Sequence, residues 1–176
     1  MNLENSSLDK LRSKIDKIDQ AILQLIEERS NLAKKIIDAK NGVNIFKPKR
    51  EQALIKKLIS KSKTSKSEYI ETIWRLLISE NLSLQGGLKI VLGPSADVYK
   101  TSLWHFGNGA KFESEETDIK ALKKLITGKF DAAVVRASDE LEEIITIDNI
   151  EIQKLVETPI TNQKNLDRVA IYKLLN

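Results

Sequence analysis

The feature that most constrains this chain is an apolar stripe recurring every three or four residues from Leu8 to Ala39. This spacing puts its members on one face of an α-helix of about thirty residues, roughly 45 Å long. The two shorter helical segments that follow cannot cover so long a stripe on every side, so a second copy of the chain is the simplest cover. We call this stripe the N-terminal seam; it comprises Leu8, Leu11, Ile15, Ile18, Ile22, Leu25, Arg29, Leu32, Ile36 and Ala39.

Arg29 is the charged position of the N-terminal seam. Its guanidinium could extend past the seam or pair with Glu27 or Glu28, as lone arginines usually do. Lys40 follows eleven residues later, close to three helical turns, and projects on nearly the same side about 16 Å away. The two cations could therefore converge on a small anionic ligand.

Arg12 shares that side of the helix but precedes Lys40 by four heptads, about 42 Å. If two copies pair antiparallel about a two-fold axis near Ile26, Arg12 falls beside the partner's Lys40 and each dimer gains two identical basic sites. An equally ordinary interpretation is a solvated Arg12 paired with Asp9 or Asp16.

Two shorter helices are expected next. Pro48 suits the first turn of the second, KREQALIKKLISK, which carries Leu54, Ile55, Leu58 and Ile59 on one face and ends at the polar run KSKTSKSE. The third, about 67–84, ends before Gly86-Gly87. Its predicted stripe is Ile70, Ile73, Trp74, Leu77, Asn81 and Leu84.

The pattern of predicted secondary structure changes after Gly86-Gly87. Strands are predicted at LKIVLG, FDAAVV, IEIQKLVE and RVAIYKLL, and helices at ADVYKTSLWHFG and TDIKALKKLITG. Strands alternating with helices indicate an α/β unit. We therefore expect an all-α domain at 1–86 and a small α/β domain at 87–176.

The second helix adds Arg50 and Glu51, and the third adds Asn81 at an apolar-phase position with Gln85 one turn later. Together with the seam arginine and the lysine on its side, Glu51 and the inward-phase amide form an unusual set for a helical core. Glu51 could merely favour a helix N-terminus, and Gln85 could be an exposed residue near a helix end. Buried charges are nevertheless expensive without a counter-charge, which a dianionic ligand would supply.

Composition excludes several kinds of chemistry. The chain has no cysteine and one histidine, His105, so a thiolate nucleophile, a Ser-His triad and a Cys- or His-based metal site have little to build on. Basic and acidic residues are interleaved and aromatics are few, which disfavours nucleic acid. The N-terminus has no signal pattern and no apolar run is long enough for a membrane helix, so a soluble cytoplasmic protein is expected.

The segments LDKLRSKIDKIDQAILQLIEERSNLAKKIIDAK, PKREQ and IWRLLISENLSLQ together resemble the all-helical (AroQ-type) chorismate mutases over roughly residues 7–85. The resemblance implies an intertwined three-helix homodimer that rearranges chorismate to prephenate without metal or cofactor. It implies that Arg12 enters the partner's site, Arg29 holds a substrate carboxylate, Arg50 adds to the basic wall, Glu51 accepts from the ring hydroxyl, and Lys40 and Gln85 flank the ether oxygen.

Two positions depart from the family pattern. Lys47 stands where the family often has an aspartate that helps to bind the ring hydroxyl, which puts more weight on Glu51. Asn81 stands where a serine is common, a mild change because an amide still forms hydrogen bonds. We expect Asn81 to contact substrate.

The second unit resembles a reduced prephenate dehydratase, as in bifunctional chorismate mutase/prephenate dehydratase proteins. RASDE replaces that family's Glu-Asn-Ser segment, DRVAIY replaces its Thr-Arg-Phe, and the unit is about half the expected length. We therefore predict no dehydratase chemistry, but an appendage that supports folding or dimerisation. A small-ligand site, for example for an aromatic amino acid, at the Gly-Pro-Ser turn before residue 96 is a weaker prediction.

Two alternative functions remain open. An isochorismate pyruvate lyase would use a similar helical fold and substrate for a different reaction. A non-catalytic regulatory or binding protein is suggested by Lys47 and by the reduced second unit. Feedback by Phe or Tyr and association beyond a dimer are not decided by these patterns.

Overall fold

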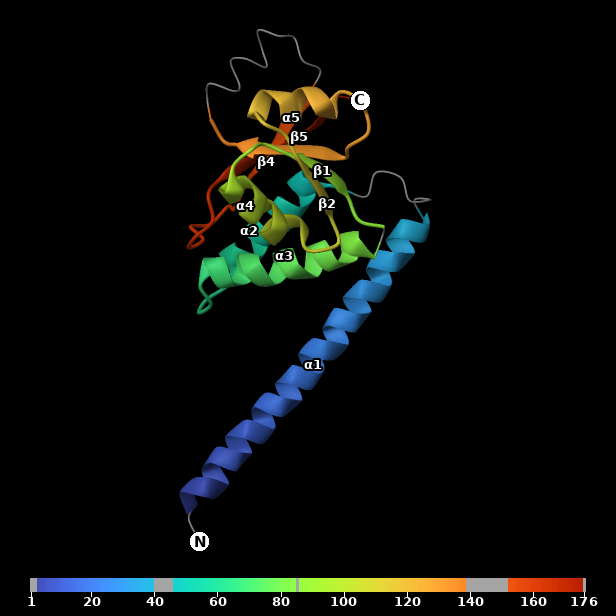
Figure 1. Cartoon of the computed structure of the whole chain (residues 1–176). Helices are drawn as coiled ribbons and strands as arrows, with labels where there is room; N and C mark the ends of the chain where they lie inside the picture. Colours follow the sequence, from blue (N-terminus) through green and yellow to red (C-terminus); the bar gives the residue numbers. More distant parts are fainter. Residues whose placement is uncertain (1–2, 40–45, 85, 139–151, 176) are drawn as a thin grey trace. The chain divides into compact units, whose positions relative to one another are not determined.

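The computed structural model describes residues 3–39, 46–84, 86–138 and 152–175 (Figure 1). The chain divides into two units, Met1–Val43 and Asn44–Asn176. The first unit contains helix α1, and the second contains the other helices and strands of the described ranges. The long N-terminal helices and the mixed α/β part are thus both confirmed, and α2 and α3 share a unit with the sheet.

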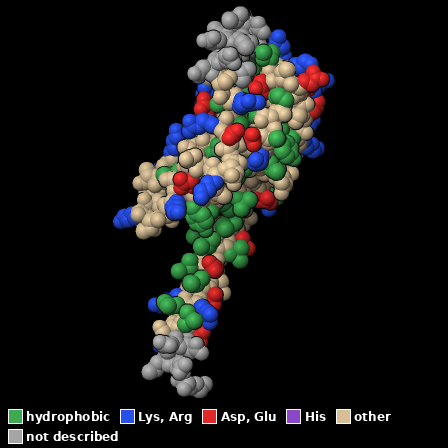
Figure 2. Space-filling model, turned by 60° about the vertical axis from the view of Figure 1, so that its left-hand side comes forward, with side chains coloured by type: hydrophobic (Ala, Val, Ile, Leu, Met, Phe, Trp, Pro, Cys, Tyr) green, Lys and Arg blue, Asp and Glu red, His purple; other side chains and the backbone are tan. Residues whose placement is uncertain are grey.

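Helix α1 runs from Leu3 to Ala39, 37 residues, and begins somewhat earlier than the sequence pattern indicated. In the single chain its N-terminal seam is open to solvent: the large aliphatic seam residues from Leu8 to Ile36 are between 45% and 64% exposed. Figure 2 shows hydrophobic side chains, in green, on the surface of this helix between charged ones. An aliphatic face of this length left in water is unfavourable for one chain alone.

The second unit is built on a sheet whose described strands have the order β2-β1-β3-β5-β4. Strands β1 (Lys89–Leu92), β2 (Lys111–Ser114) and β3 (Ala132–Arg136) are parallel, whereas β5 (Val169–Leu174) runs antiparallel to both β3 and β4 (Ile152–Thr158). The strand predictions are confirmed for β1, β3, β4 and β5. β2 was missed, because KFES has one apolar residue and little burial to reveal it.

Helices cover both faces of the sheet (Figure 1). Helix α5 (Asp118–Leu125) packs on one face, against Val91, Ala133 and Val135. Helices α2 (Pro48–Lys61), α3 (Ser67–Ser83) and α4 (Ala96–Phe106) lie on the other. The alternating side chains of β1 and β3 divide the core in this way, since successive residues of a strand point to opposite faces.

Helix α3 is the element that joins the helical and sheet parts. Its most buried residues are Ile70, Glu71, Arg75, Ile78, Ser79, Asn81 and Leu82. Leu84, which the predicted stripe included, is 52% exposed, and Ile73, Trp74 and Leu77 are half-buried. The stripe expected to form the core of α3 is therefore not its most buried face; that face is rotated toward the sheet and carries two charged residues.

Glycines let α3 approach the loop after α4. Gly107 has a φ of 73°, and a Cβ there would lie 2.8 Å from Oγ of Ser79. A Cβ on Gly109 would meet Oγ of Ser83 at 2.1 Å. Glycine at these two positions therefore permits the left-handed backbone of the first and the close packing of both.

Candidate functional site

The residues expected to bind substrate fall in three places. Arg12 and Arg29 lie on α1, in the first unit, and Arg50, Glu51 and Asn81 lie in the second. Lys40 and Gln85, expected to face the ether oxygen, lie outside the described residues. The structure therefore describes the substrate-binding candidates of each unit separately.

On α1 the two arginines differ in exposure. Arg12 is exposed, and its Nη1 is 3.4 Å from Oδ1 of Asp9, a surface ion pair of little energetic weight. This pairing is the ordinary alternative for Arg12 within a single chain. Arg29 is half-buried and already has an interaction partner.

The start of α2 carries a cationic wall. Pro48 occupies the first turn, as expected, and Arg50 and Lys47 are exposed beside it. These residues line a hollow of about 380 Å³, together with Lys49 and, from the sheet, Lys173. Lys47, the departure from the family pattern, thus adds positive charge to the wall that Arg50 was predicted to form.

Glu51 faces the interior and not that wall. Its Oε2 is 3.3 Å from Nη1 of Arg75 on α3, and its side chain is 13% exposed. Arg75 is fully buried. Burial lowers the pKa of Arg75, while the nearby carboxylates of Glu51 and Glu71 partly restore it. A guanidinium held by two carboxylates stays charged, and the paired Glu51 acts as a hydrogen-bond acceptor.

A buried histidine completes this cluster. Nη1 of Arg75 is 3.5 Å from Nε2 of His105, whose Nδ1 lies 2.9 Å from Oγ1 of Thr158. Burial lowers the pKa of His105 well below 6.5, and the charge of Arg75 lowers it further. The ring is therefore neutral, so Nε2 accepts from Arg75 and Nδ1–H donates to Thr158.

Glu71 anchors α3 to the segment after β4. Its carboxylate is fully buried and accepts from the backbone N–H groups of Ile160 and Thr161, both at 2.9 Å, and from the hydroxyl of Thr161. Three donors replace the water that the carboxylate loses on burial. Glu71 thus fixes the helix that carries Arg75.

Asn81 is also buried, and its side chain is turned toward its own helix. Nδ2 donates to the carbonyl of Leu77 at 2.8 Å, while Oδ1 has no hydrogen-bond partner within the described ranges. The same NH₂ group has a second N–H, so the bond to Leu77 uses only part of the hydrogen-bonding capacity of this amide. The contact of Asn81 with substrate stays a prediction.

The sequence pattern missed Arg75, Glu71 and His105. The available signal was the pair Glu71 and Arg75, four residues apart and in phase with Ile78 and Leu82 on a second apolar face of α3. For His105, nothing in the local sequence indicates the contact with Arg75. That contact joins positions 30 residues apart in the chain.

The Gly-Pro-Ser turn, the weaker candidate for a small-ligand site, is used locally. Oγ of Ser95 accepts from the backbone N–H of Asp97 at 3.2 Å and so caps α4. Among the described residues, no group of His, Cys, Asp and Glu side chains could hold a metal ion. No helix in the described ranges has both the length and the apolarity needed to cross a membrane.

Comparison with known proteins identifies the family. The family described as chorismate mutase type II matches residues 11–86. A chorismate mutase of Methanocaldococcus jannaschii is 40% identical over 83 residues, which cover 83% of that protein and 44% of this chain. The chain belongs to the type II chorismate mutase family. All the predicted site residues, from Arg12 to Gln85, lie within the matched range.

The family resemblance continues past the helices. A bifunctional chorismate mutase/prephenate dehydratase of Aquifex aeolicus is 31% identical over 191 aligned positions, which include 95% of this chain and 53% of the relative. A protein of the same description from Buchnera aphidicola is 39% identical over 85 residues, which cover 46% of this chain and 22% of that protein. The α/β part is thus similar to a dehydratase-type segment, and the chain spans about half the length of the Aquifex relative. No solved structure matches the chain significantly.

Proposed function

We propose that this chain is a chorismate mutase that converts chorismate to prephenate in aromatic amino acid synthesis. The observation that carries the proposal is the family match over 11–86, which contains every charged or amide side chain that the resemblance assigns to substrate. The cationic wall at Lys47 and Arg50 supports it, since chorismate carries two carboxylates.

The chemistry suits such a chain. Within one molecule the ether C–O bond breaks while a new C–C bond forms, so no atom, proton or electron enters or leaves. Arginines that clamp the carboxylates hold the enolpyruvyl arm folded over the ring, an orientation effect. Fixed donors stabilise the negative charge that grows on the ether oxygen, the role proposed for Lys40 and Gln85.

We propose that the active form is an intertwined homodimer, with Arg12 entering the partner's site. The open N-terminal seam of α1 supports this proposal, because an aliphatic face of this length requires a cover. Tyr69, Leu76 and Leu84 on the outer side of α3 are also more than half exposed and offer further apolar surface for the same assembly.

Glu51 is assigned to the substrate's ring hydroxyl, and Asn81 to a secondary contact. The pairing of Glu51 with Arg75 supports its role as an acceptor, because the buried guanidinium holds the carboxylate in one orientation. Asn81 can take part while it keeps its bond to Leu77, because its amide has a second N–H and an acceptor oxygen.

The α/β part, 87–176, is proposed as an appendage without dehydratase activity, and the 86–87 boundary is supported by the end of the family match. Its packing against α2 and α3 supports a folding role. A cytoplasmic location belongs to the same proposal, because a dianionic metabolite does not cross a bilayer unaided.

The proposal is tested by measuring the turnover of chorismate, isochorismate and prephenate by the purified full-length protein. Prephenate formed from chorismate, above the uncatalysed rate, supports the proposal. Salicylate and pyruvate from isochorismate would instead identify a pyruvate lyase. Tight binding of a transition-state mimic without turnover of either compound would identify a non-catalytic binding protein. Phenylpyruvate formed from prephenate would contradict the proposed absence of dehydratase activity.

A further inference from the structure

We propose that Arg75 is a positioning residue for Glu51, and that the α/β part of the chain holds Arg75 in place through His105 and Thr158. The inference rests on the proposed role of Glu51 in binding the substrate hydroxyl. The α/β part thereby holds the side chain of Glu51, through Arg75, in the proposed mutase site.

The contacts form one continuous line through four elements. Thr158 at the end of β4 contacts His105 on α4, His105 contacts Arg75 on α3, and Arg75 contacts Glu51 on α2. The first three side chains are at most 2% exposed, whereas that of Glu51 is 13% exposed. The line therefore starts in the core and ends at a carboxylate at its margin.

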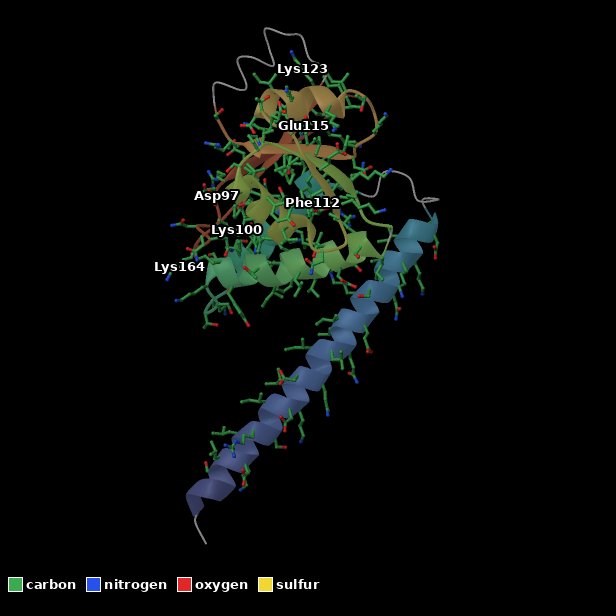
Figure 3. All side chains as sticks on the ribbon, viewed as in Figure 1. Asp97, Lys100, Phe112, Glu115, Lys123 and Lys164 are labelled. Carbon is green, nitrogen blue, oxygen red and sulfur yellow. The ribbon has the colours of Figure 1, made fainter. Side chains whose placement is uncertain are left out.

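Each hydrogen bond in this series determines which atom of the next side chain donates and which accepts. Thr158 accepts from Nδ1–H of His105, which leaves Nε2 as the acceptor that faces Arg75. The neutral ring is also held edge-on against Phe106, with ring centroids 4.6 Å apart. The inner face of α4 thus belongs to the core, while Asp97 and Lys100 lie on its outer face (Figure 3) and form an exposed ion pair at 3.3 Å.

The bonding of Arg75 is unlike that of an arginine kept only for stability. Such a guanidinium would be expected to satisfy most of its five N–H donors. Here Nη1 alone makes hydrogen bonds, and Nε and Nη2 are buried without a partner within the described part of the chain. Leaving buried donors unpaired is costly, so stability alone would not favour this arrangement. The carboxylate that Arg75 contacts in this arrangement is that of Glu51.

The inference is tested by a double-mutant cycle in the full-length protein, with kcat and KM measured for chorismate. Glu51→Gln and Arg75→Met should each raise KM by about tenfold and change kcat less, because the first replaces the carboxylate by a weaker amide acceptor and the second removes the guanidinium that orients it. The double variant should have the KM of Glu51→Gln alone. His105→Leu should raise KM in the same direction, and His105→Gln, which keeps an acceptor, should recover most of the loss.

Thr101→Val is the matched control. Thr101 is fully buried on α4, one turn before His105, and donates to the carbonyl of Asp167 at 2.9 Å, away from Arg75. It should lower stability without changing KM. If Arg75→Met does not fold, the double-mutant cycle of His105→Leu with Glu51→Gln tests the positioning of Glu51 in its place.

An unchanged KM in Arg75→Met and His105→Leu, or effects that multiply with Glu51→Gln, would overturn the positioning role while leaving the proposed function intact. Absence of chorismate turnover in the wild type would overturn both.

Discussion

Helices α1 and α3 both place an arginine in the phase of an apolar face, but the chain surrounds those faces differently. The aliphatic N-terminal seam of α1 is about half exposed along its length. On α3, Ile78 and Leu82 are each 7% exposed because they pack in one core cluster with residues of the α/β part. Helical periodicity reveals that a face is apolar, but it does not reveal what covers the face.

The two helices also carry two kinds of arginine. Arg75 has its counter-charges, Glu51 and Glu71, within the same unit, so the chain itself supports its charge. Arg29 belongs to a face that we propose is covered by a second copy, where a dianionic substrate adds negative charge. In these two proposals, Arg75 orients Glu51 from within the folded chain, and Arg29 acts in the dimer.

The largest effect should come from breaking the seam. Ile22→Glu places a charge in the proposed interface of each copy, so dimers and turnover should be lost together, with kcat/KM reduced by more than about a thousandfold. Sedimentation velocity and a chorismate assay measure the two losses. Gln24→Glu, off the seam on the same helix, is the control; a monomeric and fully active Ile22→Glu protein would refute the intertwined site.

Lys40→Ala should leave the dimer intact but lower kcat by about a hundredfold, because it removes one fixed donor to the ether oxygen. Gln85→Ala should act in the same direction. Stopped-flow or steady-state turnover, with circular dichroism for folding, measures the effect. Lys35→Ala, which changes an exposed lysine on another side of α1, should retain wild-type kcat. Wild-type kcat in both site variants would reject their role.

On α3, Glu71→Gln should lower the free energy of unfolding by about 2 kcal/mol, because the new NH₂ group faces backbone donors and the buried charge that balances Arg75 is lost. Urea unfolding measures this change. Glu80→Gln, exposed on the same helix, should be neutral. Equal stabilities for the two variants would mean that the contacts of Glu71 add little to the joint between α3 and the sheet.

The smallest effect concerns pH. His105 has a pKa below its unfolded value of about 6.5, so below that pH the unfolded chain binds a proton that the folded chain does not. Stability should be fully present above pH 6.5 and fall by about 1.4 kcal/mol per pH unit as the pH drops toward the folded pKa. Urea unfolding between about pH 7.5 and 5.5 should show this slope in the wild type and lose it in His105→Gln. An identical slope in both proteins would assign the effect to other groups.

Local patterns were sufficient for most elements. The long helix at Leu3–Ala39, the proline start of α2 and the strands of AAVVR and VAIYKL all follow from residue spacing and type. The exposed strand β2 was missed because its four residues carry almost no apolar signal. Strand order and the coverage of each sheet face depend on contacts between distant segments, which no local pattern encodes.

The sequence by itself determined that a long amphipathic helix carries cations at regular spacing, and that the family motifs surround them, because helical geometry fixes which side chains share a face. Only the tertiary structure decided that Glu51 forms an ion pair with Arg75 and that His105 contacts the same guanidinium. These contacts join α2, α3 and α4 across the core. A buried charge is costly without counter-charges and hydrogen-bond partners, and only the fold brings those partners together.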